Sequence, residues 1–187
     1  MSFARDVKKE LITIPLSFDP LKAQLYGLLQ FGSERIISNR KMQIQFKTTS
    51  LSMSRFIIST LKKLYQINVE LSMKSRDKLD YKRLYYILIE EKAEDILKDL
   101  YLMDEFYQKI DEVNTDILAG DQCVNAYLRG AFLAKGSIND PNKPNYHLEI
   151  VAYAKEQADY IYKVLEELNL EPKVILRAKG YVIYLKK

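Results

Sequence analysis

Apolar side chains recur at helical spacing in six stretches of the chain. In the first stretch, Phe3, Val7 and Leu11 stand four residues apart, which places them on one face of a helix that Ser2 would cap. Asp19 and Pro20 mark the start of the second, since they suit the N-cap and the first helical position. The predicted helices are residues 3–12, 20–32, 53–64, 96–100, 121–135 and 155–169.

Strict alternation marks the strands. Between residues 41 and 47, Met42, Ile44 and Phe46 alternate with polar or basic residues, so one face of that strand is apolar and the other is not. A run rich in Gly, Asn, Asp and Pro at residues 136–145 predicts a turn. The predicted strands are residues 34–38, 41–47, 67–74, 82–90, 146–153, 172–178 and 180–185.

The order of elements repeats along the chain. Residues 25–29 (LYGLL) and 128–132 (LRGAF) share a pattern of leucine, any residue, glycine and two apolar residues, and Gly-Ser follows each copy. We predict an α+β protein made of two pseudo-symmetric αββαββ repeats, with residues 1–102 and 121–187 joined by a connector at 103–120. The first repeat ends in a helix that the second lacks, so we expect the natural protein to continue past Lys187.

Charge is unevenly distributed. The chain has 29 basic and 25 acidic residues, and 18 of the basic and 12 of the acidic residues lie before residue 104. Basic residues gather at 33–47 and 74–83. These stretches are interpreted either as solvated hairpin ends or as a surface that follows a phosphate backbone. One cysteine, Cys123, excludes a disulfide framework, and the lone His147 suits a structural role better than metal binding. No apolar run is long enough to span a membrane, so we expect a cytoplasmic protein.

The duplicated helix motif resembles that of the LAGLIDADG homing endonucleases. The resemblance implies that the two motif helices pack through Gly27 and Gly130, and that the strands form a saddle-shaped antiparallel sheet on DNA with helices packed on one face. In that family the eighth motif position is an acid that binds a divalent metal. Here the degenerate positions are Gly32 and Lys135, so we expect no catalytic residue, no metal and no cofactor.

Four segments resemble the WhiA family more closely still. They are residues 1–4 (MSFA), 127–137 (YLRGAFLAKGS), 146–150 (YHLEI) and 179–186 (KGYVIYLK). WhiA-like proteins join a non-cleaving LAGLIDADG-type domain to a C-terminal helix-turn-helix domain, a pattern that this chain lacks. They are DNA-binding regulators tied to bacterial cell division and, in sporulating actinobacteria, to sporulation. The resemblance implies a non-enzymatic, nucleoid-associated monomer whose partners are double-stranded DNA and the transcription machinery.

If the predicted saddle faces DNA, the side chains opposite its apolar face enter the groove. These are Lys41, Gln43, Gln45 and Lys47 in the first repeat, and Lys173 and Arg177 in the second. Residues placed at hairpin ends near phosphates are Arg35, Arg40, Arg76, Lys82 and Lys179. Each also fits a solvated surface residue. Two alternatives therefore stay open: a protein-interaction platform whose DNA binding resides in the helix-turn-helix domain, and, less favoured, a metal-dependent endonuclease.

Overall fold

The computed structural model describes residues 2–75, 83–144 and 147–186, and these form two compact units. One unit is the continuous segment Gly32–Lys109, and the other combines Met1–Phe31 with Ile110–Lys187. Among the described residues, no helix has the length and apolar character needed to cross a bilayer. The units differ from the predicted sequence repeats, because each unit is defined by its internal contacts and one of them combines two separate stretches of chain.

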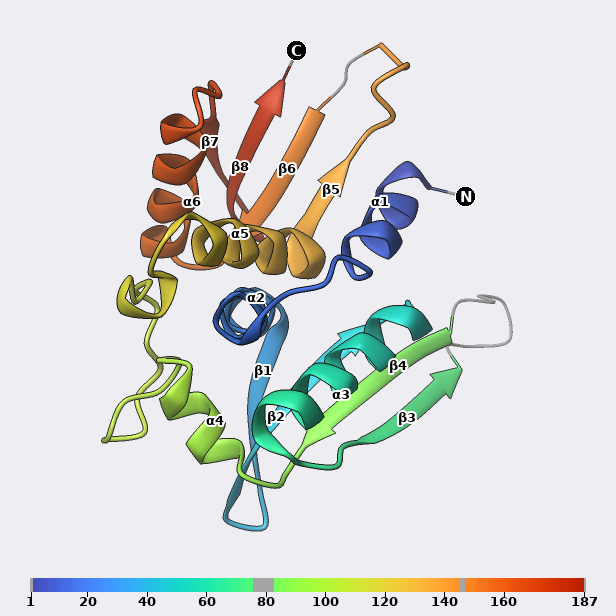
Figure 1. Ribbon diagram of the computed structural model, residues 1–187, viewed down its shortest axis with the longest axis vertical. Coiled ribbons are helices and arrows are strands. Elements are labelled where there is room, and N and C mark those ends of the chain that lie inside the picture. Colours follow the sequence, from blue (N-terminus) through green and yellow to red (C-terminus); the bar gives the residue numbers. More distant parts are fainter. Residues whose placement is uncertain (1, 76–82, 145–146, 187) are drawn as a thin grey trace. The chain divides into compact units, whose positions relative to one another are not determined.

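The continuous unit is built on an antiparallel four-stranded sheet in the order β1-β2-β4-β3. Helix α3 lies across one face of it (Figure 1), where Ile44, Ile57 and Ile87 are fully buried. Ser50 starts α3 by accepting a hydrogen bond from the Met53 N–H, and Gln66 ends it in the left-handed conformation. The elements are β1 (Ser33–Ser38), β2 (Lys41–Thr48), α3 (Leu51–Tyr65), β3 (Glu70–Ser75), β4 (Arg83–Ile89) and α4 (Ala93–Asp99).

The discontinuous unit contains both motif helices and a second antiparallel sheet, in the order β5-β6-β8-β7. Helix α6 packs along one face of this sheet, where Ile150, Ile161 and Ile183 are buried. The elements are α1 (Phe3–Leu11), α2 (Phe18–Gly32), a 3-10 turn (Asp116–Leu118), α5 (Asp121–Lys135), β5 (Gly136–Ile138), β6 (His147–Ala152), α6 (Lys155–Glu167), β7 (Lys173–Arg177) and β8 (Gly180–Lys186).

The predicted α+β class and the antiparallel strands are confirmed, with one strand misread. Residues 136–145 were predicted to be a turn, but Gly136, Ser137 and Ile138 form β5 and pair with β6. A stretch of three residues that begins with glycine is too short to show the alternation by which a strand is recognised. This strand is defined by its pairing with β6. Ser2 stands at the N-cap of α1 but makes no capping hydrogen bond.

Candidate nucleic-acid interface

The two motif helices cross at their glycines. A Cβ atom built on Gly27 would lie 2.4 Å from the carbonyl oxygen of Tyr127, and one built on Gly130 would lie 2.2 Å from that of Gln24. Both distances are far inside van der Waals contact and both neighbours are backbone atoms. The backbones of α2 and α5 therefore meet directly, and only a residue without a side chain fits on either helix.

A buried polar network locks this crossing. The Tyr127 hydroxyl donates to Gln30 Oε1 at 2.5 Å, and the Asn114 N–H donates to the Tyr26 hydroxyl oxygen at 3.0 Å. The rings of Tyr26 and Tyr127 lie 5.2 Å apart. Burial raises the pKa of Tyr127 well above its ordinary value, and the neighbouring Tyr26 and Tyr160 add to the shift. The network therefore stays neutral and serves packing rather than proton transfer.

The ends of the motif helices carry no acid. Helix α5 ends at Lys135, whose Nζ lies 5.3 Å from the centroid of the Tyr153 ring, and α2 ends at Gly32 after the buried Phe31. A divalent cation needs oxygen ligands, and a lysine at this point would repel it. In the part of the chain that the structure describes, no three His, Cys, Asp or Glu side chains gather to hold a metal.

In the sheet of β1 to β4, the face away from α3 carries the side chains predicted for β2, namely Lys41, Gln43, Gln45 and Lys47. Register adds acidic neighbours to this face. Lys47 Nζ lies 3.1 Å from a carboxylate oxygen of Glu34, and the Gln43 amide donates to Glu90 at 2.7 Å. The described cations of this face are Lys41, Lys47 and Lys74, and its acids are Glu34, Glu70 and Glu90. This face is therefore charge-balanced.

Arg35 and Arg40, both predicted at hairpin ends, lie in different settings. Register puts Arg35 within β1 opposite Ile44, on the side that α3 covers, and its guanidinium donates to the Tyr107 carbonyl at 3.2 Å. Arg40 lies in the β1–β2 turn, where it and Asn39 have positive φ, and it is exposed. Arg76 and Lys82 fall outside the described residues.

The sheet of β5 to β8 has the more basic open face. Lys173 and Glu149 both pair with Tyr184, so they share the face opposite the buried Ile150 and Ile183. The described charged residues on this face are Lys173, Arg177, Lys186 and Glu149, with His147 beside them. Three cations thus stand against one acid, although the second half of the sequence is acidic overall. Sequence reasoning missed Lys186, which two-residue alternation from Val182 and Tyr184 could have placed here.

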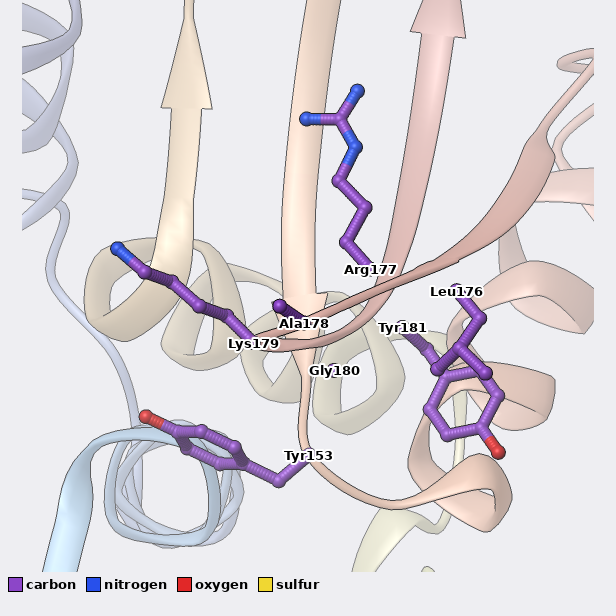
Figure 2. A pocket seen from close by; sticks show the side chains of 7 residues that line it. All are labelled: Tyr153, Leu176, Arg177, Ala178, Lys179, Gly180 and Tyr181. Atoms are coloured by element: carbon purple, nitrogen blue, oxygen red, sulfur yellow. The ribbon is translucent and has the colours of Figure 1, made fainter.

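One open pocket of about 460 Å³ lies at the β7–β8 turn (Figure 2). Figure 2 shows Lys179 and Tyr153 extending to the same side in this view, with Leu176 and Tyr181 toward the other. The turn depends on Gly180, which has a φ of +123° and lies so close to Ala152 that a Cβ would be 2.3 Å from its carbonyl oxygen. The described lining residues are Tyr153, Leu176, Arg177, Ala178, Lys179, Gly180 and Tyr181, which include two cations and no acid.

The fold and the glycine crossing define a protein of the LAGLIDADG class. Full-length WhiA from Thermatoga maritima matches with a TM-score of 0.73 at 23% identity, over all of this chain and 58% of the other. The homing endonuclease I-WcaI, bound to its DNA recognition sequence, matches with a TM-score of 0.59 at 16% identity, over 95% of this chain and 80% of the other. These likenesses establish the fold.

Sequence comparison gives the family. The WhiA N-terminal LAGLIDADG-like domain matches residues 20–103, and the WhiA LAGLIDADG-like domain matches residues 124–187. The chain therefore belongs to the WhiA family, as its sequence segments predicted. Relatives named probable cell division protein WhiA, from Bacillus cereus and Bacillus anthracis, are 36% identical over all 187 residues. The chain spans 59% of the length of these relatives.

Proposed function

We propose that this chain is a non-catalytic, DNA-binding part of a WhiA-type regulator of bacterial cell division. The observation that carries the proposal is the open face of the β5–β8 sheet, where Glu149 is the one acid among the described residues and the cations are Lys173, Arg177 and Lys186. Cations in a row on a sheet attract the phosphate backbone of a duplex without a cofactor. The DNA-bound I-WcaI supports the assignment by its fold, and the relatives' name supports the role in division.

The proposal excludes cleavage for a chemical reason. Phosphodiester hydrolysis on this fold depends on carboxylates at the motif helix ends, and Gly32 and Lys135 supply none. The alternative of a metal-dependent endonuclease would need ligands from elsewhere, which Mg²⁺-dependent nicking of plasmid DNA would reveal. We further propose that the protein acts as a cytoplasmic, nucleoid-associated monomer and that residues 1–102 and 121–187 are the duplicated repeats.

The candidate DNA-contacting residues fall into two groups, according to whether the side chain already has an acidic partner in the structure. Lys173 and Arg177 are exposed, and no described acid pairs with either. Lys47 is held by Glu34 and Gln43 by Glu90, so each would have to give up a partner before it touched DNA. Gln45 is therefore the better candidate of the two glutamines for reading a base edge. At the turns, Arg40 and Lys179 are exposed and suit phosphate contacts.

The test is fluorescence anisotropy of the chain on a labelled generic duplex, titrated with salt. We expect the K173Q/R177Q double variant to lower the log–log salt slope by about 2, because each lost phosphate contact removes about 0.9. The matched control is K62Q/K63Q, which removes two exposed charges from α3. No wild-type binding at roughly 50 mM salt would refute DNA binding by this chain, because non-specific binders still hold there.

A second candidate is a protein-interaction platform, and one unit favours it. The β1–β4 face is charge-balanced, and Phe106 in the same unit is 82% exposed beside the half-exposed Tyr107. Exposed aromatic side chains are enriched at protein interfaces. The partner would be the transcription machinery or a helix-turn-helix domain of the same protein. If the Phe106→Ser variant bound such a partner more weakly but bound the duplex as the wild type does, this unit would be assigned to protein contacts.

A further inference from the structure

Two lysines lie together at the end of the second motif helix. Helix α1 packs against α5 and β5, and this brings Lys8 Nζ to 5.5 Å from the centroid of the Phe132 ring. Lys135, one turn further along α5, has its Nζ 5.3 Å from the centroid of Tyr153. Both lysines are half-buried, and neither forms an ion pair with a described residue.

This arrangement costs the free protein stability. Burial lowers the pKa of Lys8 to about 8, and the like charge of Lys135 adds to the effect. Aromatic rings attract an ammonium group only weakly, so Phe132 and Tyr153 do not replace an acid. An anion placed between the two ammonium groups would relieve both the burial penalty and the repulsion.

The lysine pair adjoins the pocket shown in Figure 2 through Tyr153. Tyr153, whose ring Lys135 approaches, is also a wall of that pocket, and Arg177 and Lys179 belong to the other walls. Tyr153 therefore links Lys135 of α5 to a pocket that Arg177 and Lys179 line, and Lys8 of α1 lies beside Lys135; no acid is among the described lining residues of the pocket. Several cations spread over a few side-chain lengths suit a polyanion better than a single small carboxylate.

We propose that Lys8 and Lys135 form a phosphate-binding site, and that on DNA this site takes one backbone phosphate beside those bound by Arg177 and Lys179. Lysine binds phosphate as a flexible point charge, so Lys8 and Lys135 can bind a phosphate while they stay beside the Phe132 and Tyr153 rings. That the bound phosphate belongs to DNA rests on the proposed DNA-binding function, whereas the anion site itself rests on the lysine pair. A free phosphate is the other source of the same chemistry.

The first arm of the test measures duplex binding by fluorescence anisotropy against salt. We expect K8Q and K135Q each to reduce the log–log slope by about 0.9 and the affinity roughly eightfold at 0.1 M salt, which is one phosphate contact. The matched control is K9Q, which removes the same charge from an exposed position on α1 and should leave the slope unchanged. The second arm follows the ring resonances of Phe132 and Tyr153 by NMR as inorganic phosphate replaces chloride at constant ionic strength.

The two arms separate the possible results. Loss of slope in K8Q and K135Q but not in K9Q supports the site on DNA. Equal slopes in all variants, with ring resonances that inorganic phosphate moves in the wild type but not in K135Q, overturn the DNA assignment and leave a free-phosphate site. Ring resonances that phosphate does not move, with equal slopes, overturn the whole inference. A wild type that fails to bind the duplex refutes the proposed function, and the NMR arm alone then decides the anion site.

Discussion

Replacing Gly130 by alanine tests the direct contact between the motif helices. The new Cβ would lie 2.2 Å from the Gln24 carbonyl oxygen and 2.8 Å from the Leu28 nitrogen. Since non-bonded atoms settle at about 3.5 Å, the helices must separate by roughly 1 Å at the crossing. Overpacking of this kind costs about 3 kcal/mol at the upper end of its usual range. Alanine recovers about 1 kcal/mol of helix propensity, which leaves a net loss of about 2 kcal/mol in the free energy of unfolding.

The assay is equilibrium unfolding in urea, followed by circular dichroism. We expect a lower midpoint for Gly130→Ala with an unchanged slope, because the folded and unfolded states keep their surface areas. The control is Asn125→Ala on the exposed side of α5, which should raise stability by a few tenths of a kcal/mol through propensity alone. The double variant with Gly27→Ala should cost less than the sum of the single changes, since one separation relieves both clashes.

A Gly130→Ala protein that unfolds at the same urea concentration as the wild type, or a higher one, would refute the direct backbone contact. Fully additive costs in the double variant would show instead that the two glycines act at separate places. Either result would remove the geometric reason for glycine at these two motif positions.

Three further predictions concern the same unit. Tyr127→Phe removes the donor to Gln30 Oε1 and strands a buried acceptor, so urea unfolding should show a loss of about 1–3 kcal/mol, and wild-type stability would contradict the network. Gly180→Ala forces a side chain into a positive φ against the Ala152 carbonyl, and a melting temperature equal to that of the wild type would contradict the turn geometry. Lys8 has a folded-state pKa of about 8 against an ordinary 10.5, so between these values only the unfolded state holds its proton and stability rises with pH. Lys8→Met should lack this rise of about 1 kcal/mol between pH 8 and 9.5, and an equal rise in both proteins would contradict the burial of Lys8.

Local patterns predicted the elements well because each pattern has a local cause. The alternation of Met42, Ile44 and Phe46 follows from a pleated strand with one buried face, and the structure has that strand as β2. The echo of Leu25-Tyr26-Gly27 in the second half predicted two equivalent helices. Their glycines do lie at one crossing. The resemblance to the LAGLIDADG family predicted this close packing, whereas the spacing of residues alone did not.

The candidate site was predicted less well because its properties depend on register. The Glu34 carboxylate reaches Lys47 only because β1 pairs with β2 in one particular alignment, which no local pattern specifies. The face on which Arg35 lies also depends on register, since a shift of one residue in a strand exchanges its two faces. Lys8 was read as part of a helix, and its closeness to Lys135 follows from the packing of α1, which lies far from α5 in sequence.

The division of the chain into a continuous and a discontinuous unit has a consequence for biosynthesis. Helix α2 buries eleven of its residues, and its partner α5 begins at Asp121. A ribosome that has made the chain as far as Lys109 has synthesised all of the Gly32–Lys109 unit, while the apolar surface of α2 still lacks α5. The Gly32–Lys109 unit can therefore mature first, whereas Met1–Phe31 must wait for the synthesis of α5, so a nascent chain stalled before α5 would present α2 to chaperones or to aggregation.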